Sequence, residues 1–239
     1  MTAPLARRLA SEFVGTAMLL AVVVGSGIMG ERLSGGNDAL ALLGNTLATG
    51  AALYALILVF GPVSGAHLNP AVTLAFALRR DLPAVDAVAY AATQAAGALV
   101  GVVIAHLMFD LAPFAPSTTE RQGTGVLLGE AVATFGLILT LLGALRWRPS
   151  ATPAAVGLII AAGYWFTSST SFANPAVTIA RTLTDTFSGV RAAHAPGFIA
   201  AEFAGALVAT AFAAWLFAPE ERGYRAGDAG ASRTLPDAG

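Results

Sequence analysis

The chain has 239 residues, of which 56% are hydrophobic and 11% charged, and its formal net charge at pH 7 is −1. This balance excludes a nucleic-acid-binding surface and an ordinary soluble domain, because both carry far more charge. The sequence contains no cysteine, so disulfides and thiol chemistry are excluded as well.

Long uncharged runs follow one another along the chain and predict a multi-pass membrane protein. A spanning helix needs roughly 20 apolar residues, and most of the runs reach that length. With a break at Pro175, they predict six spans and two shorter helical pieces. The runs are Phe13–Gly30, Ala39–Ala66, Ala87–Ala105, Ala131–Leu145, Ser150–Ala180 and Phe203–Pro219.

The first run follows Arg7 and Arg8, which leaves a cleaved signal peptide as an alternative. The pattern that opens this run at Glu12 returns at Glu130, which favours a retained span. All 13 basic residues are arginine, and their distribution predicts cytoplasmic termini, because basic residues accumulate on the cytoplasmic side. Nine are predicted on that side, Arg7, Arg8, Arg79, Arg80, Arg146, Arg148, Arg222, Arg225 and Arg233, and four on the other, Arg32, Arg121, Arg181 and Arg191.

The pentapeptide Asn-Pro-Ala-Val-Thr occurs twice, at 69–73 and 174–178, inside uncharged sequence. Proline suits the first turn of a helix and asparagine is a favoured cap, so each copy predicts a helix start. When two such starts lie inside a membrane, their positive dipole ends and their amides can meet at one polar point. The repeated motif therefore indicates a pore.

The stretch 39–78 holds 40 residues without a formal charge. This is too long for one helix and too short for two spans with a loop, so one span and a re-entrant half-helix are predicted. Gly61, Pro62, Gly65 and Ala66 are predicted to form the turn that brings the chain back. Non-helical backbone at this depth must lie against protein or line a water-filled cavity.

Three landmarks recur in the same order and define two units. Glu12 and Glu130 are 118 residues apart, the two motifs 105, and Gln94 and Glu202 108. Each unit carries three spans, so the second enters the membrane inverted and a site is expected at the midplane. Residues 1–239 thus form a single membrane channel domain, with repeats at about 9–109 and 124–217 and a disordered tail at about 220–239.

Two ionisable groups lie inside predicted spans, which makes them functional candidates. Glu12 and Glu130 either relay protons in a transporter or accept backbone N–H groups from the re-entrant loops, and their recurrence favours the second role. His67 is expected to anchor its loop and line the wall; it has no partner at metal-ligand spacing, so no metal site is predicted. Small residues four apart predict close helix packing, within one protomer or between protomers. These pairs are Gly97 with Gly101 and Gly205 with Ala209.

Over roughly 9–217, the chain resembles the aquaporin, or major intrinsic protein, family. The resemblance rests on Ser-Gly-Ala-His-Leu-Asn-Pro-Ala-Val-Thr at 64–73, on both glutamates and on the order of the spans. It implies an all-α membrane protein, an aquaporin-like inverted repeat of six transmembrane helices plus two re-entrant half-helices. It also implies a homotetramer that conducts water or small uncharged solutes without a cofactor. The implied pore-centre residues are Asn69, Pro70, Ala71, Asn174, Pro175 and Ala176, and the implied loop supports are Glu12, His67 and Glu130.

The selectivity filter departs from the family pattern. Most members have an arginine three residues after the second asparagine, where this chain has Val177. Arg181 follows on the same helix face, about 6 Å farther out by its helical rise, and is expected in the outer vestibule. By this resemblance the filter consists of Thr49, Tyr164, Ser171 and Val177. The valine and the segment 173–181 resemble bacterial aquaglyceroporin-like channels found with arsenic-resistance genes.

This second resemblance implies trivalent metalloid hydroxides (arsenite, antimonite) and polyols such as glycerol as solutes, with water, in the bacterial inner (cytoplasmic) membrane. Arsenite at neutral pH is an uncharged tri-hydroxide of about glycerol's size, and its thiophilic arsenic meets no thiolate in a cysteine-free pore. The alternatives are a water-selective aquaporin and a proton-coupled secondary transporter, which shares inverted repeats and broken helices. An intramembrane enzyme is disfavoured, because Ser168, Ser169 and Ser171 have no histidine base in their segment.

Overall fold

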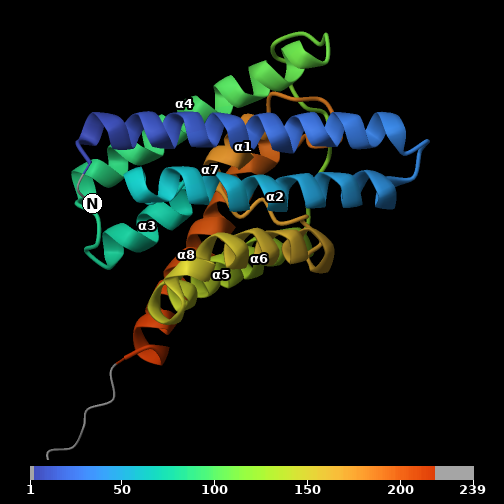
Figure 1. Ribbon diagram of the computed structural model, residues 1–239. Coiled ribbons are helices and arrows are strands. Elements are labelled where there is room, and N and C mark those ends of the chain that lie inside the picture. The colour runs from blue at the N-terminus through green and yellow to red at the C-terminus, as the bar shows by residue number, and fades with distance from the viewer. Residues whose placement is uncertain (1–2, 219–239) are drawn as a thin grey trace, which may run out of the picture.

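The computed structural model describes residues 3–218, and this part of the chain is helical, without a strand (Figure 1). The all-α architecture is therefore confirmed, while the predicted disordered tail lies outside the described residues. The α-helices are α1 (Leu5–Leu33), α2 (Asp38–Ser64), α3 (Pro70–Leu78), α4 (Ala84–Met108), α5 (Thr124–Trp147), α6 (Thr152–Phe166), α7 (Pro175–Arg181) and α8 (Ala195–Leu216). Two short 3₁₀ helices, η1 (Pro149–Ala151) and η2 (Ala192–His194), precede α6 and α8.

Five helices are long and apolar enough to cross a membrane: α1, α2, α4, α5 and α8, the last together with η2. The remaining predicted span, α6, has only 15 residues, or about 22 Å at 1.5 Å per residue. The 3₁₀ helix η1 leads directly into it and adds about 6 Å, which brings the pair close to the hydrocarbon thickness. Pro149 and Pro153 each occupy the first turn of their helix, the place that proline tolerates best. This span therefore begins as a short 3₁₀ helix and continues as an α-helix, with a proline in the first turn of each part.

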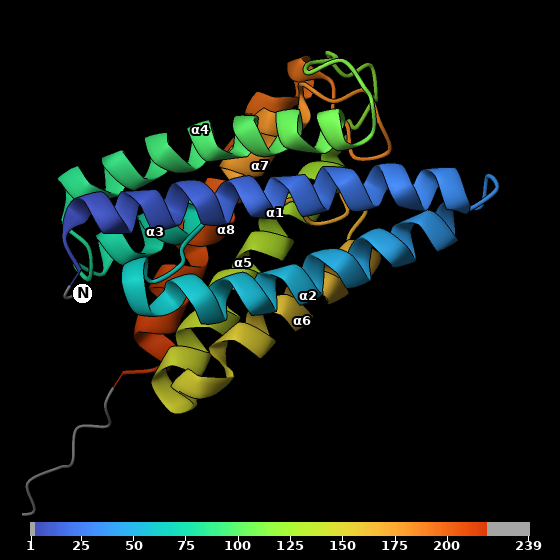
Figure 2. The ribbon, with the colours of Figure 1, turned by 45° about the horizontal axis from the view of Figure 1, so that its top comes forward.

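Glycines bring α4 against α1 and α8 against α5, and Figure 2 shows α4 running alongside α1. A Cβ atom added at Gly101 would lie 2.3 Å from the carbonyl oxygen of Ala17, and one at Gly205 would lie 2.3 Å from that of Ala131. Gly97 approaches α1 nearly as closely, with its added Cβ atom 2.4 Å from the carbonyl oxygen of Phe13. Of the two packing alternatives, the structure shows the one within the protomer.

The two units meet where α2 crosses α6. A Cβ atom at Gly157 would lie 2.6 Å from the carbonyl oxygen of Gly50, so the backbones touch with no side chain between them. The short helices α3 and α7 also contact each other and begin at the prolines of the two motifs. Each half-helix also packs on a span of the opposite unit, α7 on α4 and α3 on α8, so both units contribute spans and a half-helix to the boundary.

The re-entrant turn begins later than the sequence predicts. α2 continues through Gly61 and Pro62 to Ser64, so these two residues are helical rather than part of the turn. Gly65, in the left-handed conformation at φ 89°, ends the helix, which is the usual role of glycine at a helix C-terminus. Within a packed bundle, a proline near the helix end removes one backbone hydrogen bond without forcing the chain to turn. Of the four predicted turn residues, only Gly65 and Ala66 lie outside the helix.

Left-handed backbone recurs at equivalent places in both re-entrant segments. Ala66 and Leu68 have φ values of 47° and 49°, and their counterparts Ser171 and Ala173 have values of 52° and 47°. Residues with side chains rarely adopt this conformation, and it persists only where surrounding contacts enforce it. The repeat thus extends to the strained backbone before each motif.

Candidate pore and its constriction

Asn69 and Asn174 cap the two half-helices and link the two units. Each side-chain oxygen accepts a hydrogen bond from the backbone N–H of its own motif's alanine, at 2.8 and 3.0 Å. Each Nδ2 donates to a carbonyl of the opposite unit, from Asn69 to Ala173 at 2.7 Å and from Asn174 to Leu68 at 2.8 Å. An amide has two N–H groups, so one on each asparagine remains for the cavity that both line. The other pore-centre residues, Pro70, Ala71, Pro175 and Ala176, form the buried first turns of α3 and α7.

Glu12 is completely buried and accepts four hydrogen bonds. Its Oε1 accepts from the Ser64 hydroxyl at 2.6 Å and from the His67 backbone N–H at 3.0 Å. Its Oε2 accepts from the Leu68 backbone N–H at 2.6 Å and from the Gln94 side chain at 2.8 Å. The carboxylate therefore holds the left-handed segment that leads into α3.

Glu130 occupies the same place in the second unit and is also completely buried. Its two oxygens accept from the backbone N–H groups of Phe172 at 2.9 Å and Ala173 at 2.7 Å. Glu202, on α8, accepts from the Thr178 hydroxyl at 2.6 Å. The contacts of Glu12 and Glu130 fit loop supports, and both oxygens of each of these two carboxylates accept hydrogen bonds.

His67 is buried in the first re-entrant segment and lines the cavity. Its Nδ1 lies 3.2 Å from the Thr73 hydroxyl, and its ring lies against Phe76 and Tyr90, with centroids 4.4 and 5.3 Å apart. Among residues 3–218, no group of three or more histidine and acidic side chains could hold a metal ion.

A cavity of about 500 Å³ runs past both asparagines and both re-entrant segments. Four elements bring Thr49, Tyr164, Ser171 and Val177 together in its wall, from α2, α6, the second re-entrant segment and α7. The Tyr164 hydroxyl donates to Thr49 Oγ1 at 3.3 Å. The lining here offers hydroxyls from three residues and one small apolar side chain.

Arg181, at the C-terminal end of α7, lies in the same cavity wall and is only 2% exposed. Its Nε donates to the Ser188 carbonyl. The guanidinium carbon lies 3.4 Å from the centroid of the Phe172 ring. The Cα atom lies one turn beyond Val177, but the side chain is packed inside the protein.

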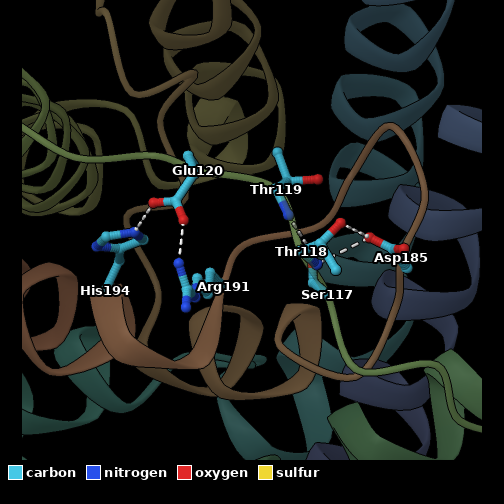
Figure 3. A network of polar contacts seen from close by, with 7 residues as sticks. All are labelled: Ser117, Thr118, Thr119, Glu120, Asp185, Arg191 and His194. Atoms are coloured by element: carbon cyan, nitrogen blue, oxygen red, sulfur yellow. Dashed lines mark hydrogen bonds and ion pairs between the residues drawn. The ribbon is translucent and has the colours of Figure 1, made fainter.

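Two connections, 109–123 and 182–194, pair with each other, and the second follows directly after α7; Figure 3 shows side-chain contacts between them. Thr118 donates to Asp185 Oδ1 from its backbone N–H at 2.9 Å and from its hydroxyl at 3.0 Å. Glu120 binds both His194 and Arg191, and these hydrogen bonds lower the pKa of its carboxyl. The network fixes the loop that carries the Ser188 carbonyl.

Sequence reasoning did not single out Phe172 or Ser188. His106 lies near the end of a predicted span, where a solvated or interfacial histidine is expected, and this expectation is wrong. His106 is completely buried, with Nδ1 2.7 Å from the Ala112 carbonyl and Nε2 2.7 Å from the Thr184 hydroxyl, so it joins the two connections. Phe172 had a usable signal, because it is the counterpart of His67, two residues before the motif.

The fold and the pore define a multi-pass membrane channel. The chain matches the family model described as "Major intrinsic protein" over residues 1–172, and it belongs to this family. Its members are channels rather than enzymes, so the predicted family and the exclusion of an enzyme are confirmed.

Individual relatives agree with this assignment. "Aquaglyceroporin AqpS" of Rhizobium meliloti (strain 1021) is 53% identical over 215 residues, which cover 90% of this chain and 92% of the relative. The "Glycerol uptake facilitator protein" of Streptococcus pneumoniae is 31% identical over 184 residues, covering 69% and 77%. The X-ray structure of the aquaglyceroporin from Plasmodium falciparum matches with a TM-score of 0.74 and 23% identity over 90% of this chain and 98% of the other. At that identity, the last comparison supports the fold alone.

Proposed function

We propose that this protein is a passive channel for small uncharged solutes, namely trivalent metalloid hydroxides such as arsenite and antimonite, polyols such as glycerol, and water. The lining around Val177 carries the proposal. A valine there leaves more room than the arginine of most family members, and the hydroxyls of Thr49, Tyr164 and Ser171 can exchange hydrogen bonds with a polyhydroxyl solute. The names of the two relatives above, an aquaglyceroporin and a glycerol uptake facilitator, support the same solute class.

A proton-coupled transporter would need carboxylates that bind and release protons during transport. Both oxygens of Glu12 accept hydrogen bonds, four in all, and two of the donors are backbone N–H groups of the first re-entrant segment. Protonating it would break contacts that hold the conduit open, which favours a channel. Flux should therefore have a weak temperature dependence and should not respond when a proton gradient is dissipated.

The same proposal covers assembly and placement. A homotetramer in the bacterial inner membrane with cytoplasmic termini follows from the family resemblance and the arginine distribution. Cross-linking in native membranes and protease access to each terminus test these two points.

Stopped-flow light scattering of proteoliposomes, paired with arsenite uptake in a sensitive host, tests the solute class. Val177→Arg should suppress glycerol and arsenite flux by about tenfold or more while sparing water, because a guanidinium narrows the neck. Val177→Thr, which keeps the shape, serves as the matched control and should pass all three solutes. Unchanged glycerol and arsenite flux in folded Val177→Arg would defeat the constriction assignment. A wild-type protein that passes water but neither larger solute would point to the water-selective alternative.

A further inference from the structure

Arg181 has a counterpart in the first unit that explains where its side chain lies. Arg181 is seven residues after Asn174, and Phe76 is seven residues after Asn69. In the first unit, Phe76 packs on the residue two before the asparagine, His67, with ring centroids 4.4 Å apart. In the second, Arg181 packs on the corresponding Phe172 at 3.4 Å. Helical side chains point toward the N-terminus of their helix, so both residues fold back toward the pore centre.

The guanidinium is held firmly but is not fully satisfied. Nε donates to the Ser188 carbonyl, and the Ser188 hydroxyl in turn donates to the Val23 carbonyl of α1 at 3.1 Å. Nη1 of Arg181 is buried and has no hydrogen-bond partner in the described chain. A buried donor without an acceptor is unfavourable. Arg181 is one of the residues that line the conduit, together with Val177 and Tyr164.

Arg181 also forms no direct ion pair among residues 3–218. The second cation near the Phe172 ring is Arg121, whose guanidinium carbon lies 5.5 Å from the ring centroid. Arg121 does not line the cavity and donates to the carbonyls of Gly189 and Phe187. Of these two arginines, Arg181 alone presents its charge to a permeating solute.

We propose that Arg181 is the specificity-determining cation of this constriction. From one turn beyond Val177, its guanidinium folds back on Phe172, donates a hydrogen bond to an oxygen of the passing solute, and repels cations. The side chain at 177 can then be small, because charge and donor come from elsewhere on the same helix. This inference rests on the proposed channel function and adds the residue that keeps a roomy neck closed to cations.

The test uses the full-length protein in proteoliposomes, with glycerol flux and sodium and proton leak measured on the same preparation. Arg181→Met keeps the length of the side chain and removes charge and donors, so cation leak should rise about tenfold or more. Arg32→Met is the matched control, because Arg32 also stacks on a phenylalanine, Phe109 at 5.0 Å, but does not line the cavity. It should leave both fluxes unchanged. Arg181→Gln, which is neutral but keeps an N–H donor, replaces the methionine variant if that protein is not monodisperse and should leak in the same way.

Returning the charge to the neck separates this role from a structural one. Arg181→Val combined with Val177→Arg should restore the cation barrier while lowering glycerol flux, since the cation is back at the narrow position. Arg181→Met or Arg181→Gln that stays as cation-tight as wild type would overturn the inference. So would a double variant that leaks as much as Arg181→Val alone. If wild-type protein passes no neutral solute, the proposed channel function fails, whatever the Arg181 variants show.

Discussion

The cavity wall differs between the two sides of the paired asparagines, although one repeat builds both. On the Arg181 side the proposed constriction consists of Thr49, Tyr164, Ser171 and Val177, which all line the cavity. On the other side, the residues at equivalent places are Val156, Ile57, Ala66 and Val72. The pairing follows the 105-residue offset of the motifs and the crossing of Gly50 with Gly157. Among these eight residues, every hydroxyl lies on the Arg181 side of the asparagines. The repeat therefore determines the shape of the conduit, while the residues on the Arg181 side determine which hydrogen bonds a solute can form.

The buried supports behind the wall differ in the same way. In the first unit an amide, Gln94, donates to Glu12, whereas in the second unit a carboxyl, Glu202, lies against Glu130. The backbone contacts of the two anchoring glutamates are nevertheless the same, two consecutive N–H groups before the motif. The comparison teaches that backbone geometry is the shared part, while side-chain partners have diverged.

Removing the anchoring carboxylates should have the largest effect on stability and should differ between the two units. Glu12→Ala leaves four donors without their acceptor, and each donor that no water reaches costs about 1–3 kcal/mol. The unfolding free energy should therefore fall by several kcal/mol, or the protein should fail to fold. Glu130→Ala should cost less, because it strands two backbone donors. The stability of both variants can be measured by thermal unfolding in detergent, with the loss of monodisperse protein as the readout. Glu31→Ala, an exposed carboxylate of the same helix α1, is the control, and an equal loss there would refute the anchoring role.

The glycine contacts test whether the two units are packed alike. Gly101→Ala and Gly205→Ala each place a Cβ atom 2.3 Å from a backbone carbonyl, so each should lower the unfolding free energy by about 1–3 kcal/mol. Gly44→Ala, in α2, has no atom within 4 Å of the added carbon and should be neutral or slightly stabilising. Differential scanning calorimetry of the three variants measures these changes in stability. A stable Gly101→Ala beside an unstable Gly205→Ala would mean that the two helix pairs are not equivalent.

The asparagine pair should behave symmetrically. Asn174→Asp and Asn69→Asp each remove a donor to the opposite unit and place a carboxylate between two positive helix ends, so each should cost about 1 kcal/mol and admit cations. Asn45→Asp is the control, since Asn45 does not line the cavity and its buried Nδ2 also donates to a carbonyl, that of Val23 at 2.8 Å. It should destabilise without a leak. Cation-tight vesicles with both pore variants would contradict the central positive focus.

Much of this architecture is readable from the sequence because its signals are local and repeated. Asn-Pro marks a helix start wherever it occurs, and the second copy turns that local signal into the meeting of two half-helices. The residue at which the re-entrant turn begins is harder to predict from the sequence. Gly61 and Pro62 break isolated helices, but they remain helical when packed in the bundle. The place of Arg181 was also hidden. Its helical rise puts the Cα atom about 6 Å beyond Val177, but only tertiary structure shows the side chain folding back over Phe172.

The smallest expected effect gives the sharpest test of how the two units diverged. Glu202 accepts from the Asn174 backbone N–H and the Thr178 hydroxyl through Oε1, and its Oε2 is buried without a partner in the described range. Two adjacent buried carboxyls cannot both stay ionised cheaply, so we expect one shared proton to do here what the Gln94 amide does beside Glu12. Glu202→Gln supplies that N–H covalently and should change stability by less than about 1 kcal/mol with normal glycerol flux. The reverse change, Gln94→Glu, brings a second carboxyl to a site already saturated with donors and should destabilise more. If Glu202→Gln proves the more damaging of the two, the carboxyl pair is not acting as a substitute for an amide, and the second unit must use its extra acid in another way.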